Sequence, residues 1–228
     1  MEPGSIRINK ALAHGTGMSR READAAVEAG RVTVNGSVAV MGQHVRPSDV
    51  VSLDGRPVTA VNYQYIVFNK SVGYVCSRRA QGDHPTIYDV LPEAYRPLKP
   101  VGRLDRDSSG LLLLTDDGDF AHRMTHPKFA KRKLYEVTLD HDLAPLHQQM
   151  IADHGVLLED GGSKLGLERL SDDHRRTWYV TMHEGRNRQI RRTFAALGYT
   201  VTVLHRTEFG GYRLDDLKAG TSLAVAKL

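Results

Sequence analysis

The sequence predicts an α+β protein in two parts, a small N-terminal module and a larger domain built on a largely antiparallel, mixed sheet. Segments that alternate like strands and segments with helical spacing follow one another without the strand–helix–strand repeat of parallel folds. Turn dipeptides such as Asn35-Gly36, which favour antiparallel hairpins, separate several short strand-like runs. Residues 59–63 lie between two segments that each look self-sufficient. We therefore expect one domain over residues 1–60 and a second over 61–228.

The composition indicates a cytoplasmic protein with its own hydrophobic core. The 228 residues are 40% hydrophobic, and 31 Lys and Arg against 27 Asp and Glu give a net charge of +4. This small excess permits a polyanionic partner without requiring one. Cys76 is the only cysteine, which excludes an intrachain disulfide and a zinc site built on cysteines. No apolar run approaches the roughly 18 residues of a membrane helix, and the acidic start is unlike a signal peptide, so we expect no membrane association.

The first sixty residues contain signals for two helices and several short strands. An amphipathic pattern from Arg7 predicts a helix that Gly15 and Gly17 end. Ser19 with Glu22 three residues later is a capping box, which predicts a second helix directly after it. The expected elements are helices over about 7–13 and 20–29 and strands over 31–34, 37–40, 50–53 and 57–58.

Four basic residues of this module, Arg7, Lys10, Arg20 and Arg21, lie near the expected helix starts. Cationic side chains and free backbone N–H groups at a helix start can both bind phosphates. An ordinary solvated basic face is the alternative that the pattern alone leaves open.

The larger domain is expected to begin with the strand Tyr65–Phe68 and a turn from Asn69 to Gly73. Residues 131–139 start with a basic triplet and then alternate apolar and polar side chains, which predicts a half-buried strand. The remaining expected elements are helices over about 120–124 and 143–153, a helix that ends before Gly198, and strands over 165–170, 178–182, 199–206 and 222–226, while the loop 77–85 stays unassigned.

The most informative stretch is Gly102–Gly110, which precedes a run of four leucines. Such a run between glycine-bearing turns predicts a buried segment, with the polar residues before it at the mouth of a hydrophobic layer. Asp105 follows apolar Leu104 and has Arg103 two positions before it, so it can be partly buried and still be kept ionised by a guanidinium. We expect Asp105 to be a working carboxylate, although a loop-stabilising role also fits the pattern.

Spacing alone suggests two metal sites, and neither is convincing. Positions one, three, five, six and twelve of a calcium-binding loop are matched by Asp105, Asp107, Ser109, Gly110 and Asp116. That loop requires a helix on each side, whereas Pro97 and Pro100 lie just upstream. His122 and His126 are four residues apart, but no third ligand stands at a matching spacing. We therefore predict no metal.

Residues 184–198 begin in a turn and continue as a helix that Gly198 ends. Ile190, Phe194 and Leu197 mark the buried face of this helix. Four arginines within seven residues leave at least one guanidinium near the boundary of the core, where it requires a carboxylate partner.

The strings Gly-Arg-Leu-Asp and Asp-Ser-Ser-Gly-Leu-Leu-Leu-Leu-Thr-Asp-Asp-Gly closely resemble the signature of the RsuA/RluB-like pseudouridine synthases. The resemblance extends through Tyr135 and residues 184–192. In the N-terminal module, Ser-Arg-Arg-Glu-Ala and Gly-Arg-Val-Thr-Val-Asn-Gly resemble the S4-type RNA-binding module. The resemblance implies the pseudouridine synthase fold, with the cleft across the sheet, and an RNA-binding role for the module.

The same resemblance implies roles for individual residues. Asp105 corresponds to the catalytic residue, Tyr135 to the aromatic that stacks on the target base, and Arg191 to the arginine that pairs with Asp105. The substrate-binding residues are expected to be Leu204 beneath the uracil, with Ile190 and Arg103. The RNA-binding residues are expected to be Arg7, Lys10, Arg20, Arg21, Lys131, Arg132, Lys133 and Arg188.

These expectations describe an enzyme that isomerises uridine to pseudouridine in ribosomal RNA. The bond from ribose to a ring nitrogen is cut, the uracil turns, and the sugar is joined to a ring carbon. No redox step or external group enters, so no cofactor is expected. The residues leave open whether Asp105 attacks the sugar or the base or assists glycal formation. Because the reacting atoms are hidden in a duplex, the target must be unpaired or flipped out.

Residues 184–192 and His126-Pro127 look more like the B-type enzymes, which modify large-subunit RNA, than the A-type enzymes, which modify small-subunit RNA. We therefore expect a uridine of the large-subunit RNA, modified by a monomer on naked or partly assembled RNA. The alternatives are a small-subunit enzyme and a non-catalytic RNA-binding or ribosome-assembly protein. A binding protein has no reason to retain Asp105, Tyr135, Arg191 and Leu204 together, which favours an enzyme.

Overall fold

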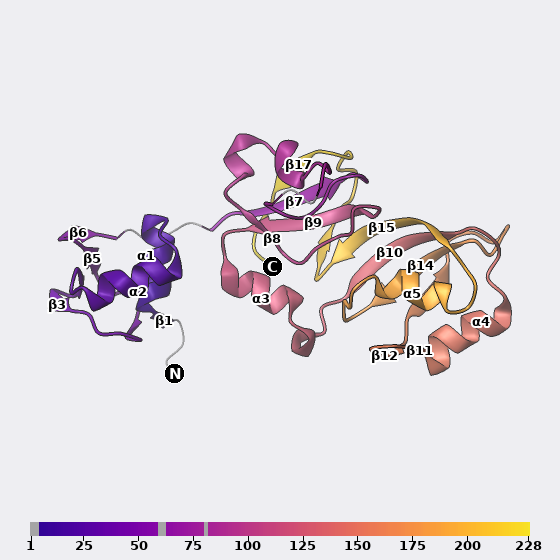
Figure 1. The fold of residues 1–228 in the computed structure, drawn as a ribbon, viewed down its shortest axis with the longest axis horizontal. Helices are drawn as coiled ribbons and strands as arrows, with labels where there is room; N and C mark the ends of the chain where they lie inside the picture. The colour runs from indigo at the N-terminus through magenta and orange to yellow at the C-terminus, as the bar shows by residue number, and fades with distance from the viewer. Residues whose placement is uncertain (1–4, 59–62, 80–81) are drawn as a thin grey trace. The chain divides into compact units, whose positions relative to one another are not determined.

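The computed structural model describes residues 5–58, 63–79 and 82–228. The chain divides into two compact units, 1–62 and 63–228 (Figure 1). Residues 59–62 of the predicted linker and residues 80–81 of the unassigned loop lie outside the described part. None of the described helices has the length and apolar composition needed to cross a lipid bilayer.

The N-terminal unit packs two helices against a small antiparallel sheet. α1 (Ile8–Thr16) and α2 (Arg20–Glu28) follow the short strand β1 (Ile6–Arg7). The sheet has the order β3-β2-β5-β6, and β1 pairs with β4. These strands are β2 (Val32–Val34), β3 (Ser37–Val38), β4 (His44–Val45), β5 (Val51–Leu53) and β6 (Arg56–Pro57).

The helix boundaries of this unit confirm one sequence signal and correct another. The Glu22 N–H donates to Ser19 Oγ (3.2 Å) and the Ser19 N–H donates to Glu22 Oε2 (2.6 Å), which is the predicted capping box. The prediction that Gly15 ends α1 was wrong, because the helix continues to Thr16. Gly17 ends it, since its φ of 77° is the left-handed conformation that glycine adopts without strain.

The larger unit is built on a nine-stranded sheet with the order β13-β14-β10-β15-β9-β7-β17, to which β8 and β16 add at β9 and β15. All its strand pairs are antiparallel except β15 with β9, so the predicted mixed, largely antiparallel sheet is confirmed. The strands are β7 (Tyr65–Lys70), β8 (Lys99–Pro100), β9 (Ser109–Thr115), β10 (Lys133–Leu139), β13 (Gly166–Arg169), β14 (Thr177–Met182), β15 (Val201–Phe209), β16 (Tyr212–Arg213) and β17 (Ser222–Ala224).

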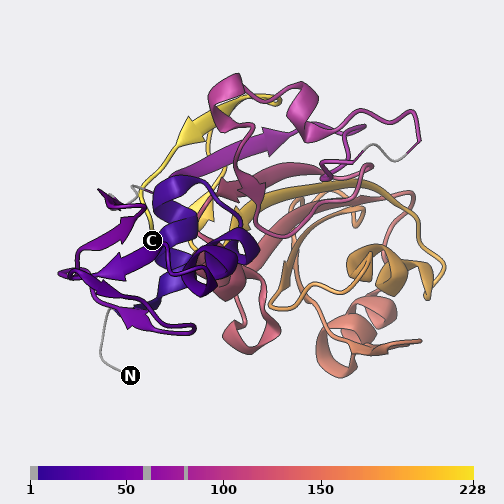
Figure 2. The ribbon, with the colours of Figure 1, turned by 60° about the vertical axis from the view of Figure 1, so that its left-hand side comes forward.

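The parallel contact between β15 and β9 joins two antiparallel half-sheets. Its register pairs His205 with Ser109 and Arg206 with Gly110. One half-sheet holds β13, β14, β10 and β15, and the other holds β9, β7 and β17. β7, β9 and β15 run side by side in both ribbon views (Figures 1 and 2). Strand pairing changes from antiparallel to parallel at this junction. The loop that contains Asp105 leads into β9, one of its two strands.

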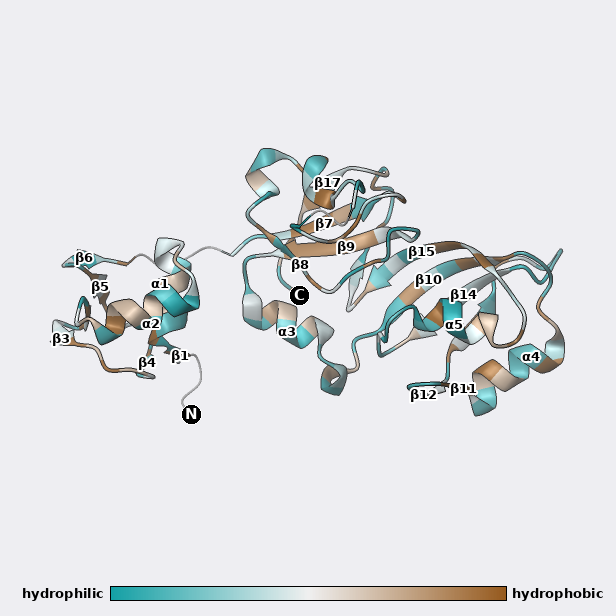
Figure 3. Cartoon of the chain, viewed as in Figure 1, coloured by the Kyte–Doolittle hydropathy of each residue, from teal (hydrophilic) through white to brown (hydrophobic). Residues whose placement is uncertain are grey.

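β9, which is coloured hydrophobic in Figure 3, carries an uninterrupted run of four leucines because it is buried on both faces. Leu112 and Leu114 point into one apolar cluster with Ile66 and Phe68 of β7. Leu111 and Leu113 point into a second cluster, on the opposite face, with members that include Tyr65, Val67, Phe120 and Met124. Each of the four leucines is no more than 1% exposed. The strand therefore has no polar face to interrupt the run.

Three helices cover the larger sheet. They are α3 (Gly118–Thr125), α4 (Pro145–Gln149), which continues as a π-helical turn (Met150–His154), and α5 (Gln189–Ala195). Asp117 caps α3 by accepting from the N–H groups of Asp119 and Phe120. Single 3₁₀ turns occur at Ile87–Asp89, Glu93–Tyr95 and Pro127–Phe129, and a hairpin of β11 (Val156–Leu158) and β12 (Gly161–Ser163) lies between α4 and β13 in the sequence.

Candidate active site

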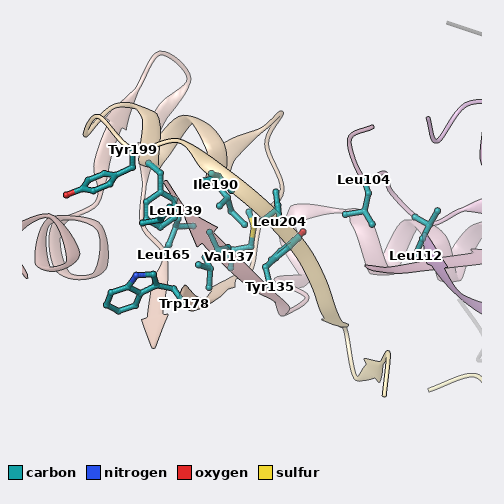
Figure 4. Close-up of a cluster of buried hydrophobic side chains, with 14 of the residues drawn as sticks. Leu104, Leu112, Tyr135, Val137, Leu139, Leu165, Trp178, Ile190, Tyr199 and Leu204 are labelled. Atoms are coloured by element: carbon teal, nitrogen blue, oxygen red, sulfur yellow. The ribbon is translucent and has the colours of Figure 1, made fainter. Parts of the chain in front are cut away.

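Asp105 lies where two adjoining cavities meet. The first, of about 290 Å³, is also lined by Tyr135, Ile190 and Leu204. The second, of about 450 Å³, also has Asp105 in its wall, and its lining is more polar than that of the first. Figure 4 shows the Tyr135 ring beside Leu204 within the apolar cluster behind the first cavity. The structure thus brings together the predicted residues Asp105, Tyr135, Ile190 and Leu204, and both cavities are also lined by Arg103 and Arg188.

A buried lysine fixes the loop that holds Asp105. Lys70, the last residue of β7, is fully buried, and its Nζ donates to the carbonyls of Ser71 (3.0 Å), Asp105 (3.0 Å) and Ser108 (2.7 Å). Burial lowers the pKa of Lys70, and nearby Cys76, Asp105 and Asp107 oppose that shift. The sequence prediction missed this role because it ended the strand at Phe68. A lysine two residues after the apolar run Tyr65–Phe68 was the available signal.

Gly110 allows the two half-sheets to approach closely. Its φ of 101° lies in the region that favours glycine. A Cβ at this position would lie 2.6 Å from the backbone nitrogen of Arg206 on the parallel neighbour β15. Only a residue without a side chain fits here, which explains the glycine that follows the two serines.

The arginine that reaches Asp105 is Arg188 rather than Arg191. Arg188 Nη1 is 3.4 Å from Asp105 Oδ2, and both Nη atoms of Arg188 bind the carboxylate of Asp107, at 3.1 and 2.9 Å. Arg191 instead donates to the carbonyls of Val201 (2.6 Å) and Asp107 (2.8 Å). Its Nε is 3.4 Å from Asp107 Oδ2. The predicted pair of Arg191 with Asp105 was therefore wrong.

Backbone geometry explains this exchange of partners. Arg188 caps α5 in the left-handed conformation, with φ of 46°, which turns the chain just before the helix. The Arg188 side chain, 44% exposed, then faces the loop of Asp105 and Asp107. Arg191 lies inside the helix, is only 12% exposed, and is held against backbone carbonyls. The hydrogen bond from Arg188 lowers the pKa of Asp107, and burial lowers the pKa of Arg191.

The turn before α5 is anchored by a hairpin that the sequence prediction did not connect to it. Arg186 donates to the carboxylate of Asp160 (2.9 Å) and to backbone carbonyls of the β11–β12 turn. Arg192 binds the same carboxylate (2.7 and 3.1 Å). Gln189 bonds to Glu184 across the turn. Two of the four arginines therefore hold the turn in place, and Arg188 is left to face Asp105.

A second correction concerns the basic triplet at the start of β10. Arg132 is exposed and pairs with Glu208 at 2.5 Å, and Lys131 is half-buried. Lys133 is only 9% exposed and lines the first cavity. Lys133 and Tyr135 are two residues apart on a strand, so their side chains leave the same face. The sequence analysis grouped Lys133 with the phosphate-binding residues, whereas the alternation of β10 turns its side chain into the cavity.

The predicted RNA-binding residues of the N-terminal unit lie on or near its surface. Arg7, Arg20 and Arg21 are exposed, and Lys10 is half-buried. Arg7 directly precedes α1, and Arg20 and Arg21 are the first residues of α2. These positions are compatible with phosphate binding at helix starts.

The calcium-loop alternative fails on geometry. Ser109 to Thr115, which would form the second half of that loop, are the strand β9. Asp105 and Asp107 face arginines. No group of three or more His, Cys, Asp or Glu side chains arranged for a metal occurs among the described residues.

Comparison with known proteins identifies the fold and the family. A family model described as RNA pseudouridylate synthase matches residues 64–196, more than half of the chain. The chain belongs to the RNA pseudouridylate synthases. A second model, the S4 domain, matches residues 6–51. The predicted family, fold and enzyme class and the S4-type module are therefore confirmed.

Relatives of this pseudouridylate synthase carry two different names. The chain is 42% identical over 217 residues to the ribosomal small subunit pseudouridine synthase A of Pasteurella multocida, covering 92% of this chain and 91% of the relative. It is 34% identical over 219 residues to the ribosomal large subunit pseudouridine synthase B of Bacillus subtilis, covering 94% and 89%. A solved structure, "Crystal structure of pseudouridylate synthase", matches with a TM-score of 0.67 and 32% identity over 97% of this chain and 96% of that chain.

Proposed function

We propose that this pseudouridylate synthase converts a uridine of ribosomal RNA to pseudouridine, with Asp105 as its catalytic carboxylate. The observation that carries the proposal is the position of Asp105 at the junction of the two cavities, one of them lined by an aromatic ring and aliphatic side chains. A flipped uracil fits the first cavity, between the Tyr135 ring and the side chains of Ile190 and Leu204. The ribose and its phosphates then lie toward the second cavity and Arg103.

Each proposed role follows from a contact in the site. Asp105, 33% exposed, can reach the sugar, and Arg188 is its charged partner in place of the predicted Arg191. Tyr135 stacks on the base, and its hydroxyl can take the proton from the new carbon centre. The S4 domain binds the RNA backbone through Arg7, Lys10, Arg20 and Arg21, and the catalytic unit binds it through half-buried Lys131 and exposed Arg132. The enzyme acts as a monomer, with no cofactor.

Two observations favour different ribosomal RNAs as the target. The turn before α5 and His126-Pro127 resemble the B-type enzymes, and we propose a uridine of the large-subunit RNA, modified on naked or partly assembled RNA. A target in the small-subunit RNA is the second candidate, because the identity of 42% to an enzyme named for the small subunit extends over most of both chains.

Pseudouridine maps of both ribosomal RNAs, made with and without the gene, test the proposal. Loss of one site in the large-subunit RNA, restored by the wild-type gene, is the expected result. Loss confined to the small-subunit RNA would replace the target and keep the chemistry. Unchanged maps of both RNAs, with no turnover of either RNA by the purified protein, would overturn the function.

A further inference from the structure

Two buried cations line the first cavity on the β10 and β15 side. Lys133 is 9% exposed and Arg206 is 2% exposed, and both belong to the cavity wall. Arg206 lies directly opposite Tyr135 in the strand register, and Phe209 lies opposite Lys133. The Arg206 guanidinium is 5.9 Å from the centre of the Tyr135 ring and 4.8 Å from that of Phe209. The two cations and the proposed base-stacking ring thus form one cluster.

In the described part of the chain, neither cation forms an ion pair with a carboxylate. Among the described residues, no acidic oxygen lies within 4.0 Å of Lys133 Nζ or of the Arg206 guanidinium. Lys133 Nζ donates to the carbonyls of Glu184 (3.1 Å) and Lys131 (3.4 Å), and Arg206 Nε donates to the carbonyl of Leu111 (2.7 Å). Arg206 Nη2 is buried and makes no hydrogen bond. Buried cations without an anionic partner are costly, so this wall is suited to an anion that arrives with the substrate.

Because the two cations are buried in the cavity wall, they can contact only the part of the substrate that enters the cavity. A backbone phosphate stays outside the cavity, which neither Lys131 nor Arg132 lines, whereas the flipped base enters it. Uracil is neutral in RNA. It becomes an anion when the C1′–N1 bond breaks, because the bonding electron pair passes to N1 and spreads over O2 and O4. Preorganised positive charge at the place where negative charge develops is an effective form of catalysis.

We propose that Lys133 and Arg206 are catalytic residues that stabilise the uracil anion released when the glycosidic bond breaks. The inference rests on the proposed function, in which Asp105 is the catalytic carboxylate, and adds the residues that act on the departing uracil. The C1′–N1 bond breaks, its electron pair goes to the uracil, and C1′ bonds to Asp105 or loses a C2′ proton to form the glycal. The ring then turns and C5 bonds to C1′, while the bond from Asp105 to C1′ breaks or, in the glycal route, the proton returns to C2′. The C5 proton then leaves and N1 takes up a proton, so no other reactant is needed.

The charge of Lys133 gives the inference a pH dependence. Burial, and then Arg206, lower the pKa of Lys133 to about 8. The charged groups that act on it are Arg206 from β15 and Glu184 from the turn before α5, and Asp105, Arg103, Arg186 and Arg188 line the same cavity. Lys133 is therefore cationic below about pH 8 and loses its charge above it. The kcat/KM of the wild-type enzyme should fall as the pH rises through that value.

The test compares leaving groups in single turnover, with RNA that contains uridine or 5-fluorouridine at the target. Loss of the N-glycoside is followed by chromatography of the digested RNA. Fluorine stabilises the uracil anion, so the help of Lys133 matters less. Lys133→Gln should slow the uridine reaction by about 10²–10³-fold and the 5-fluorouridine reaction by at least about tenfold less. Equal slowing of both reactions would overturn the inference.

Lys131→Gln is the matched control for a backbone-phosphate contact. It should weaken RNA binding and reduce the salt slope by about one, with the same effect on both bases. If Lys133→Gln behaved in this way, Lys133 would be a phosphate contact and the inference would fall. Lys133→Arg keeps the cation and should retain activity above pH 8, where the wild-type enzyme declines. This variant and the wild-type pH profile decide the question if Lys133→Gln does not fold, since a wild-type profile that stays flat through pH 8 contradicts the inference.

Failure of the inference about Lys133 can be distinguished from failure of the proposed function. If the wild-type enzyme did not convert either RNA, the proposed function would fail and no leaving-group comparison would exist. If it converts the RNA but Lys133→Gln shows no leaving-group dependence, only the inference fails.

Discussion

Turnover should depend more strongly on the carboxylate of Asp105 than on any other side-chain group. Asp105→Asn keeps the shape of the side chain and its backbone bond to Lys70 but removes the charged oxygen. We expect turnover to fall by more than about 10³-fold with little change in fold or RNA affinity. Tritium release from RNA with a C5-labelled target, together with a binding titration, measures both quantities. Substantial turnover by a correctly folded variant contradicts the assignment.

The two arginines at the start of α5 should separate into a catalytic and a structural role. Arg188→Met removes the guanidinium that faces Asp105 and Asp107 and, because the side chain is 44% exposed, should lower turnover with little effect on the melting temperature. Arg191→Met leaves the carbonyls of Asp107 and Val201 without their donor, which should lower stability by about 2 kcal/mol and the melting temperature by roughly 4–8 °C.

Thermal melting and single-turnover rates of both variants check this division. A large stability loss in Arg188→Met, or an unchanged melting temperature in Arg191→Met, would reverse the roles. The pKa of Asp107 offers a further distinction, because loss of Arg188 removes the main cause that lowers it. The carboxylate of Asp107 in Arg188→Met should therefore titrate at a higher pH than in the wild-type enzyme, as NMR of that side chain would show.

These residues show what the sequence could and could not predict about the site. Asp105 and Tyr135 were predictable because a local motif and a strand alternation mark them. The choice between Arg188 and Arg191 was not, since it depends on a left-handed backbone at Arg188 that no local residue dictates. Lys133 carried a readable signal, because the alternation that buries Tyr135 also buries the residue two positions before it.

At the scale of the elements, the junction of β9 with β15 should tolerate no side chain at Gly110. Gly110→Ala forces a Cβ against the backbone of Arg206 and adds strain at a φ of 101°. We expect a loss of about 3 kcal/mol or more in the free energy of unfolding, measured by denaturant titration. Gly73→Ala is the control, because Gly73 has a φ of 95° but no atom within 4 Å of the added Cβ. It should lose only the strain energy, and an equal loss in both variants would contradict the close-approach explanation.

The positions of most strands and helices along the chain were predictable, whereas the contacts that support the site were not. Strand alternation and glycine-bearing turns predicted most elements of the sheet to within a few residues. Lys70 binds carbonyls 35 and 38 residues further along the chain, and Asp160 holds arginines 26 and 32 residues away. Such contacts arise only when the sheet has formed, so a reading of local patterns does not reveal them.

At the scale of the whole molecule, the S4 domain should add affinity without being needed for folding of the catalytic unit. The two units are compact on their own, and the apolar clusters of each are separate. Removal of residues 1–62 should leave the melting transition of the catalytic unit in place. It should weaken RNA binding and lower the salt slope by about one for each phosphate contact that is lost.

Calorimetry and binding titrations at several salt concentrations check this prediction. A truncated enzyme with full affinity and an unchanged salt slope would show that the catalytic unit alone recognises the RNA. The variant Arg20→Gln with Arg21→Gln in the full chain is the matched control, because it removes two exposed cations and keeps the domain.

The parallel contact at Gly110 has a consequence for how the enzyme unfolds. Among the described residues, the backbone register between the two half-sheets consists of the pairs His205–Ser109 and Arg206–Gly110, and the proposed reacting groups are divided between the half-sheets. Asp105 leads into one half-sheet, whereas Tyr135 and Leu204 belong to the other. A bound nucleotide that touches both sides is therefore a non-covalent crosslink across this short parallel junction. Substrate should raise the cooperativity of unfolding, and amide hydrogens on both sides of the junction should then exchange with solvent at one common, slower rate.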